Sequence, residues 1–297
     1  MSLSQSYQNL IIGGAGRLGQ AFYLALNRLD EENTGLKISS LMAIEHPGTP
    51  KSFFSASSRK RIFWFTGQAK SRSSKEECDL DYARLTIFLQ NNMNNFDNST
   101  EIYFPSSGGT VYGNNVIDAK EDSPLNPSNF YAEMKINCEK LLINTAESVG
   151  CKVNIFRIAN MYGSKMESQK GGLIEQMINS AILKTPFNPI VSVNSKKQYG
   201  VFDDYASRLV QITFLLSNDS NIVNTRNVYS AYEYSIKDAA NLIATHFSFK
   251  NLMADNFMDK ENMPTESVTL STNYISENTK MNWQSLSQYL NVRYNKS

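Results

Sequence analysis

Short apolar segments alternate with segments of helical apolar spacing in the first half of the chain, and this alternation limits the fold more than any other feature. Apolar residues spaced three and four apart predict helices, whereas short continuous apolar runs predict buried strands. The predicted strands cover residues 7–12, 36–45, 61–67, 99–107 and 151–163, and the predicted helices cover residues 17–29, 81–93 and 129–150. Repeated strand–helix order implies a parallel sheet with helices on both faces. We therefore predict a doubly wound α/β fold, which binds ligands at the carboxyl ends of its strands.

Beyond residue 163 the alternation becomes less regular, which predicts a smaller C-terminal lobe beside the sheet. Two helices and two short strands are expected there, at residues 171–184, 235–247, 187–193 and 224–231. Ser235 is a typical N-terminal cap for the second of these helices. We assign residues 1–163 to the sheet domain, with part of 195–245 returning to it, and residues 164–297 mainly to the smaller lobe.

Charge and cysteine content argue against several classes of function. Lys and Arg number 29 against 28 Asp and Glu, so a net charge of +1 gives no overall attraction to nucleic acid or to an anionic membrane. The 3 cysteines and 2 histidines show no metal-ligand spacing, so we expect no metal site and no disulfide framework. No segment has the pattern of a signal peptide or a membrane span, and we expect a cytoplasmic protein without nucleic-acid or membrane partners.

Gly13, Gly16 and Gly19 lie in the sequence IIGGAGRLGQ, directly between the first predicted strand and the first predicted helix. At this place the glycines permit a tight turn, a close approach of the backbone to a pyrophosphate, and close helix–strand packing. We therefore predict a dinucleotide site here, to which Arg17 and Leu18 also belong. The alternative is an ordinary flexible turn.

The choice between NAD and NADP depends on two further side chains. Glu45 ends the second predicted strand, where an acid binds the adenosine ribose of NAD; the alternative is a solvent-exposed loop carboxylate. Arg17 has the opposite implication, because a guanidinium in the turn could bind the 2′-phosphate of NADP. We expect NAD, with NADP as the alternative.

Tyr131 and Lys135 lie one helical turn apart, near the start of the helix that follows the sequence PSSGGTVYG at 105–113. For so short a motif the alternative is a surface pair without a chemical role. At the strand ends, however, the lysine ammonium and an oxidised nicotinamide would both favour the phenolate and lower the tyrosine pKa from about 10. Tyr131 is therefore a candidate general base that removes a hydroxyl proton while the cofactor takes a hydride from the same carbon.

Five segments, GGAGRLG, SSGGTVYG, YAEMK, FRIANMYG and VFDDYA, occur in an order and spacing that resemble the extended short-chain dehydrogenase/reductase superfamily. Over roughly residues 9–245 the chain is most similar to the NAD-dependent epimerase/dehydratase branch, typified by UDP-glucose 4-epimerase. The resemblance implies a Rossmann-type cofactor domain and a small C-terminal lobe that binds a nucleotide sugar. It also implies a homodimer formed through helices near 82–93 and 130–148.

The resemblance further implies a catalytic set made of Tyr131, Lys135 and a hydroxyl from the segment SSGGTVYG. Ser107 is our first choice for this hydroxyl, with Ser106 and Thr110 behind it. Its expected role is to orient the sugar oxygen toward the tyrosine.

The same resemblance places Asn160 and Lys197 near the substrate phosphates, and it exposes departures from the family pattern. Gly108 stands where many relatives carry the catalytic hydroxyl. Gly109 and Thr110 replace the acidic pair of dehydratases, which disfavours dehydration. Lys197 replaces a common arginine and lacks its bidentate geometry, and a second diphosphate-binding arginine is absent near the segment ENMPTESV.

Together these features predict an enzyme that modifies a nucleotide-activated sugar by hydride transfer through a keto intermediate. Epimerisation is placed ahead of keto-sugar reduction, and enzymes of this kind often supply surface polysaccharides. The third alternative is a cofactor-binding relative without turnover that acts as a sensor or an assembly partner. Gly108 favours that alternative, whereas the retained Tyr131 and Lys135 oppose it.

Overall fold

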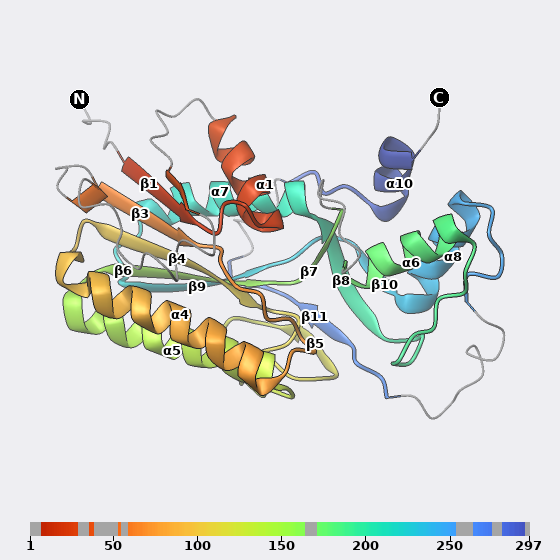
Figure 1. Ribbon diagram of the computed structural model, residues 1–297, viewed down its shortest axis with the longest axis horizontal. Helices are drawn as coiled ribbons and strands as arrows, with labels where there is room; N and C mark the ends of the chain where they lie inside the picture. The colour runs from red at the N-terminus through yellow and green to blue at the C-terminus, as the bar shows by residue number, and fades with distance from the viewer. Residues whose placement is uncertain are drawn as a thin grey trace.

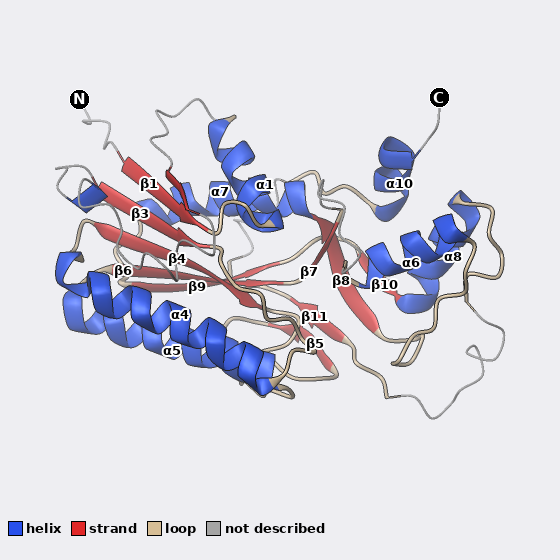
Figure 2. Cartoon of the chain, viewed as in Figure 1, coloured by secondary structure: helices blue, strands red, loops and turns tan. Residues whose placement is uncertain are grey.

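The computed structural model describes residues 7–28, 36–38, 53–54, 59–163, 171–253, 264–274 and 281–294. In this part of the chain a larger sheet is covered by helices on both faces, and a smaller sheet lies near the carboxyl ends of its strands (Figures 1 and 2).

The larger sheet has six strands in the order β2-β1-β3-β4-β6-β9, and every pairing is parallel. Its strands are β1 (Tyr7–Ile12), β2 (Leu36–Ile38), β3 (Arg59–Trp64), β4 (Thr100–Ser107), β6 (Lys152–Ile158) and β9 (Val223–Val228). Strand β1 lies between β2 and β3, so the direction in which the chain adds strands reverses there. Open α/β sheets bind ligands beside such a reversal. The predicted doubly wound fold is confirmed.

Helices cover both faces of this sheet in the described part of the chain (Figure 1). Helix α1 (Arg17–Asn27) packs against α7 (Phe202–Ser217), and helix α4 (Lys75–Asn92) packs against α5 (Phe130–Val149). Helix α4 begins earlier than residue 81, the start predicted from apolar spacing. Ser74 caps it by accepting a hydrogen bond from the Glu77 amide, and the Glu77 carboxylate accepts one from the Ser74 amide. This reciprocal cap is readable in the sequence, and the prediction overlooked it.

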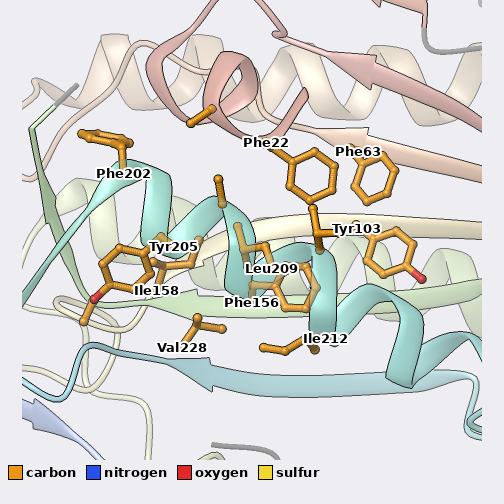
Figure 3. Packing of buried hydrophobic residues seen from close by; sticks show 14 of the residues in the cluster. Phe22, Phe63, Tyr103, Phe156, Ile158, Phe202, Tyr205, Leu209, Ile212 and Val228 are labelled. Atoms are coloured by element: carbon orange, nitrogen blue, oxygen red, sulfur yellow. The ribbon is translucent and has the colours of Figure 1, made fainter. Parts of the chain in front are cut away.

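Large aromatic side chains fill the layer between the sheet and helices α1 and α7 (Figure 3). The ring centroids of Phe22 and Phe63 lie 4.6 Å apart, and those of Phe63 and Tyr103 lie 4.8 Å apart. Leu209 of α7 packs into the same layer. Each such side chain contributes roughly 1.5–3 kcal/mol on burial, so the sheet is a rigid support for the loops at its edge.

The smaller sheet has five strands, β10, β8, β11 and β5 in that order, with β7 also paired to β8. Their bounds are β5 (Val116–Ala119), β7 (Asn160–Tyr162), β8 (Lys196–Val201), β10 (Glu233–Ser235) and β11 (Val268–Leu270). Helices α6 (Leu173–Leu183), α8 (Ile236–His246) and α10 (Leu286–Tyr294) share one apolar cluster with this sheet, and a short 3-10 turn, η1 (Met93–Asn95), follows α4. Strands β5 and β7 follow β4 and β6 in the chain, so both cross from the large sheet to the small one.

Some predicted elements differ from the observed ones. The strand predicted at 151–163 divides at Ala159, because its last residues pair with β8 of the smaller sheet. The strand predicted at 187–193 is wrong, since only Phe187 forms an isolated bridge, to Met253, and prolines flank it in the sequence. Most of the strand predicted at 36–45 lies outside the described residues. Ser235 caps α8 as predicted, in a reciprocal cap with Asp238.

Candidate active site at the carboxyl ends of the strands

The glycine turn follows β1, and its geometry requires glycine at two positions. Gly13 has a φ of +88°, and a Cβ there would lie 2.5 Å from the backbone of Phe65 and Thr66. A Cβ at Gly19 would overlap the carbonyl oxygen of Gly13. Gly16 is the N-cap of helix α1 and makes no side-chain hydrogen bond to the first amides of the helix. The cradle therefore suits an anionic group bound by backbone, as a cofactor pyrophosphate is.

Two buried hydroxyls at the strand ends lack hydrogen-bond partners within the described ranges. They belong to Thr66, which follows β3, and to Thr110, which follows β4. An unpaired buried hydroxyl is costly, and a bound polar group at these strand ends would supply the missing partners. Together with the glycine cradle, these orphaned atoms fit a dinucleotide at this edge of the sheet.

Asp81 of α4 holds the loop that follows β3. Its Oδ2 accepts hydrogen bonds from the amides of Gln68 and Ala69, each at 2.7 Å, and its Oδ1 accepts one from Arg84 at 2.6 Å. The loop begins against the glycine turn, because the Phe65 amide donates to the Ile12 carbonyl at 2.7 Å. Asp81 thus fixes the loop that lies against the glycine turn, a role that apolar spacing did not reveal.

Helix α5 places Tyr131 and Lys135 beside the end of β4. Asn129 starts the helix by accepting a hydrogen bond from the Ala132 amide at 2.9 Å. The Lys135 ammonium donates to the Pro105 carbonyl at 2.9 Å and lies 5.6 Å from the centroid of the Tyr131 ring. The tyrosine and the lysine, predicted from their spacing and their position after the segment 105–113, therefore lie together, and Lys135 is hydrogen-bonded to the strand that ends in Ser107.

The serine and glycine residues at the end of β4 have distinct environments. The Ser106 hydroxyl donates to the buried carboxylate of Glu139. Ser107 is half-buried. A Cβ at Gly108 would lie 2.8 Å from the Arg157 carbonyl oxygen and would overlap Leu270. No side chain fits at position 108, which explains the departure from the family pattern there.

Asn160 and Lys197 lie on neighbouring strands of the smaller sheet. Asn160 donates to the Gln198 carbonyl at 3.2 Å, and a Cβ at Gly109 would lie 3.4 Å from its side-chain oxygen. Lys197 lies 3.8 Å from Glu266 of the segment before β11. Burial lowers the pKa of Lys197, and the Glu266 carboxylate partly opposes this shift. Glu266 is a charged neighbour that the sequence did not indicate.

Arg17 turns toward the second lobe. Its guanidinium lies 3.4 Å from the Glu175 carboxylate at the start of α6 and 5.1 Å from the centroid of the Phe202 ring. Burial raises the pKa of Glu175, and Arg17 opposes that rise. Leu18 packs against the core beneath α1. Glu45, the predicted ribose ligand, lies outside the described residues.

Within the described ranges, no group of three or more His, Cys, Asp or Glu side chains is arranged to hold a metal ion. None of the helices in the described part of the chain is both long enough and apolar enough to cross a membrane.

Comparison with known proteins gives a consistent result. A model of the NAD dependent epimerase/dehydratase family matches residues 67–244. The dTDP-4-dehydro-6-deoxyglucose reductase of Escherichia coli is 29% identical over 228 residues, which cover 68% of this chain and 70% of the reductase.

Solved structures extend the likeness to most of the chain. UDP-glucose 4-epimerase of Thermotoga maritima matches with a TM-score of 0.74 at 19% identity. The match covers 95% of this chain and 96% of the epimerase chain. An NAD-dependent NDP-hexosamine 5,6-dehydratase of tunicamycin biosynthesis matches with a TM-score of 0.75 at 16% identity. The match covers 97% of this chain and 96% of the dehydratase chain. At these identities the structural likeness establishes the fold alone.

Proposed function

The chain belongs to the NAD-dependent epimerase/dehydratase family, and on this premise we propose that it transfers hydride between NAD and a carbon of a nucleotide-linked sugar. It is an NAD-dependent sugar-nucleotide enzyme of the extended short-chain dehydrogenase/reductase type. The observation that carries the proposal is the placement of Tyr131 and Lys135 on α5, with Lys135 bonded to the Pro105 carbonyl beside Ser107.

The proposed roles follow from these positions. Tyr131 exchanges a proton with the sugar oxygen at the reacting carbon, and Ser107 orients that oxygen by a hydrogen bond. Lys135 stabilises the tyrosine phenolate electrostatically. Thr110 supplies a second hydroxyl beside them. Bound NAD supplies the hydride acceptor or donor.

The cofactor would be held by the backbone of Gly13, Gly16 and Gly19 with Leu18 and Arg17, and by Lys135. NAD is favoured over NADP, because Arg17 is engaged by Glu175 rather than directed at a 2′-phosphate. In the second lobe, made mainly of residues 164–297, Asn160 and Lys197 would bind the substrate phosphates.

Reduction of a keto-sugar is the leading version of the reaction. The Escherichia coli reductase is 29% identical to this chain over 228 residues, whereas the Thermotoga maritima epimerase is 19% identical. In this version Tyr131 donates a proton to the carbonyl oxygen while the carbonyl carbon would receive a hydride from bound NADH, giving an alcohol and NAD⁺. Epimerisation, the second candidate, uses the same residues but returns the hydride to the opposite face of the sugar, so NAD is not consumed.

We also propose a homodimer, formed through helices α4 and α5. The two helices lie together on one face of the large sheet (Figure 1). Leu80 and Ile87 of α4 are 59% and 43% exposed, and Phe130 of α5 is 48% exposed. A second copy would cover these apolar side chains.

The experiment offers the purified protein a panel of nucleotide sugars, including keto-sugars, and follows NADH by absorbance and the products by mass spectrometry. Stoichiometric oxidation of NADH supports reduction, and interconversion of sugars without net NADH change supports epimerisation. The variant Tyr131→Phe is expected to lose about 10²–10⁴ in kcat while retaining NAD affinity. Full turnover by Tyr131→Phe would contradict the proposed mechanism.

A further inference from the structure

One buried ion pair lies directly behind the turn that carries Ser107. Arg157 of β6 donates to both carboxylate oxygens of Glu139 on α5, with its Nη2 at 2.7 Å and its Nε at 3.2 Å. The two side chains are only 8% and 3% exposed. Ser106 donates its hydroxyl to the same carboxylate. One end of the turn is therefore attached to this pair.

The other end of the turn is attached to the same guanidinium. Arg157 Nη1 donates to the Tyr112 hydroxyl at 3.0 Å and to the Glu121 carbonyl at 2.9 Å. The Tyr112 hydroxyl in turn donates to the Asn227 side chain at 2.7 Å. The segment between Ser106 and Tyr112 is thus held at both ends by one arginine–carboxylate pair.

Helix α5 contacts β4 through successive turns. Lys135 donates to the carbonyl of Pro105, and Glu139, one turn later, accepts from Ser106. Tyr131 lies one turn before Lys135 on the same helical face. The helix that carries the tyrosine is therefore attached to both residues that immediately precede Ser107.

We propose that Glu139 and Arg157 are the positioning residues of this site: they fix the turn 106–112, with Ser107 and Thr110, against the helical turn that carries Tyr131. The role of Ser107 in this inference rests on the proposed function. The claim that the ion pair fixes the turn 106–112 does not depend on that function. Neither residue touches the reacting atoms, and each acts through the turn.

The Arg157 guanidinium keeps its charge over the working pH range. Burial lowers the pKa of Arg157, but the hydrogen bonds and the charge of Glu139 outweigh burial and raise it overall. Well-packed apolar residues often stabilise a core as well as a buried ion pair does. They could not bond Ser106, Tyr112 and the Glu121 carbonyl at once, which is the reason to assign the pair a positioning role.

The first test compares Glu139→Gln with Glu101→Gln. Glu101 is a matched control, since it is a buried carboxylate on β4 that lies 3.5 Å from Arg61 and accepts a hydrogen bond from Tyr103 at 2.7 Å. Both variants are expected to lose stability. Only Glu139→Gln is expected to lower kcat, by at least about tenfold, with KM and NAD affinity changed less than about threefold. If Glu139→Gln does not fold, the milder variant Ser106→Ala takes its place, and it should also lower kcat.

A double-variant cycle separates positioning from general damage. If Glu139 acts through Ser107, Glu139→Gln should lower kcat by less than about threefold in the Ser107→Ala background. An equal loss of kcat in both backgrounds would overturn the inference. So would a Glu139→Gln protein that is destabilised like Glu101→Gln but keeps its kcat.

Hydrogen exchange on the full chain tests the structural part without turnover. The Gly108 amide donates to the Ile158 carbonyl at 2.8 Å, and the Val111 amide donates to the Ser107 carbonyl at 3.0 Å. Glu139→Gln should speed exchange at both amides by at least about tenfold relative to Glu101→Gln. Unchanged exchange would overturn the inference. Faster exchange in a protein that turns over no nucleotide sugar would refute the proposed function and leave the positioning role intact.

Discussion

Arg17 of the glycine turn forms an ion pair with Glu175, the residue that follows it by 158 positions, with 3.4 Å between Nη1 and Oε1. The pair joins the first turn of α1 to the first turn of α6. Both side chains are mostly buried, at 27% and 17% exposed. This charge pair therefore connects the glycine turn to helix α6 of the second lobe.

Breaking this pair should change cofactor selectivity. Glu175→Gln releases the guanidinium of Arg17 for a 2′-phosphate, so NADP affinity should improve by about threefold or more relative to NAD affinity. Arg17→Ala should weaken NAD binding by about three- to tenfold. Titration of each variant with both cofactors measures this, and Arg28→Ala, at the exposed far end of α1, is the control. If Glu175→Gln changes the affinities for NAD and NADP equally, the Arg17–Glu175 pair does not determine cofactor selectivity.

Substrate binding should depend on pH through Lys197. Burial lowers its pKa from the ordinary 10.5, so the ammonium is lost at a lower pH than in an exposed lysine. Affinity for a substrate phosphate should therefore fall as the pH rises toward 10.5. Lys197→Arg keeps its charge and should abolish that fall in a KM profile.

A control variant and the pH dependence of stability both check the role of Lys197. The exposed neighbour Lys196, paired with Glu233 at 3.7 Å, is the control, and Lys196→Arg should leave the profile unchanged. The stability effect of Lys197 has a definite sign: between its two pKa values the unfolded chain binds more protons than the folded one, so this residue adds stability as the pH rises through that interval. If affinity still falls at alkaline pH in Lys197→Arg, another group must cause that fall.

Adding a side chain at Gly108 should destabilise the protein. Gly108→Ala places a methyl group 2.8 Å from the Arg157 carbonyl oxygen, at a cost of roughly 1–3 kcal/mol. Gly109→Ala meets only Asn160 at an ordinary 3.4 Å and should change stability by less than about 0.5 kcal/mol. Denaturant unfolding of the two variants gives the comparison. Similar losses at both positions would show that crowding at 108 is not the cause.

The cysteine thiols should be unreactive in the folded protein. Cys78, Cys138 and Cys151 are all buried, and burial raises the pKa of Cys138 to about 12 and that of Cys151 to about 11. At pH 8 the thiolate fraction of Cys138 is then more than about 10³-fold below that of an exposed cysteine. Labelling by a thiol reagent should proceed at the rate of unfolding, and the 3 thiols of the chain should all react in denaturant. Fast labelling without unfolding would contradict the burial.

The sequence predicted those features that depend on local pattern. Apolar spacing located α1 and α5, and the position of the glycines between β1 and α1 indicated the turn. Tyr131 and Lys135 were found because they lie one helical turn apart at the start of the helix that follows the segment 105–113. The division of the strand at Ala159 was not predictable, since the apolar run is continuous across it and only pairing with β8 separates the two parts.

The unpredicted parts of the site are pairings between distant residues. Glu139 lies on the same helical face as Tyr131 and Lys135, which is a weak signal, but nothing local links it to Arg157. Glu175 and Glu266 are ordinary acids in the sequence, and only the fold brings them to Arg17 and Lys197. Gly108 was recognised as a departure from the family pattern. The cause of this departure is crowding by Arg157 of the neighbouring strand β6, which only the fold shows.

The crossing of β5 and β7 from one sheet to the other bears on how such a chain can diversify. Val116 of β5 pairs with Val268 of β11, and Asn160 of β7 pairs with Tyr199 of β8. The small sheet is therefore assembled from segments interleaved with the large one, and no single cut releases it. Recombination cannot exchange the second lobe as one contiguous block. Any exchange of the second lobe would therefore have to replace several separate segments of the chain together.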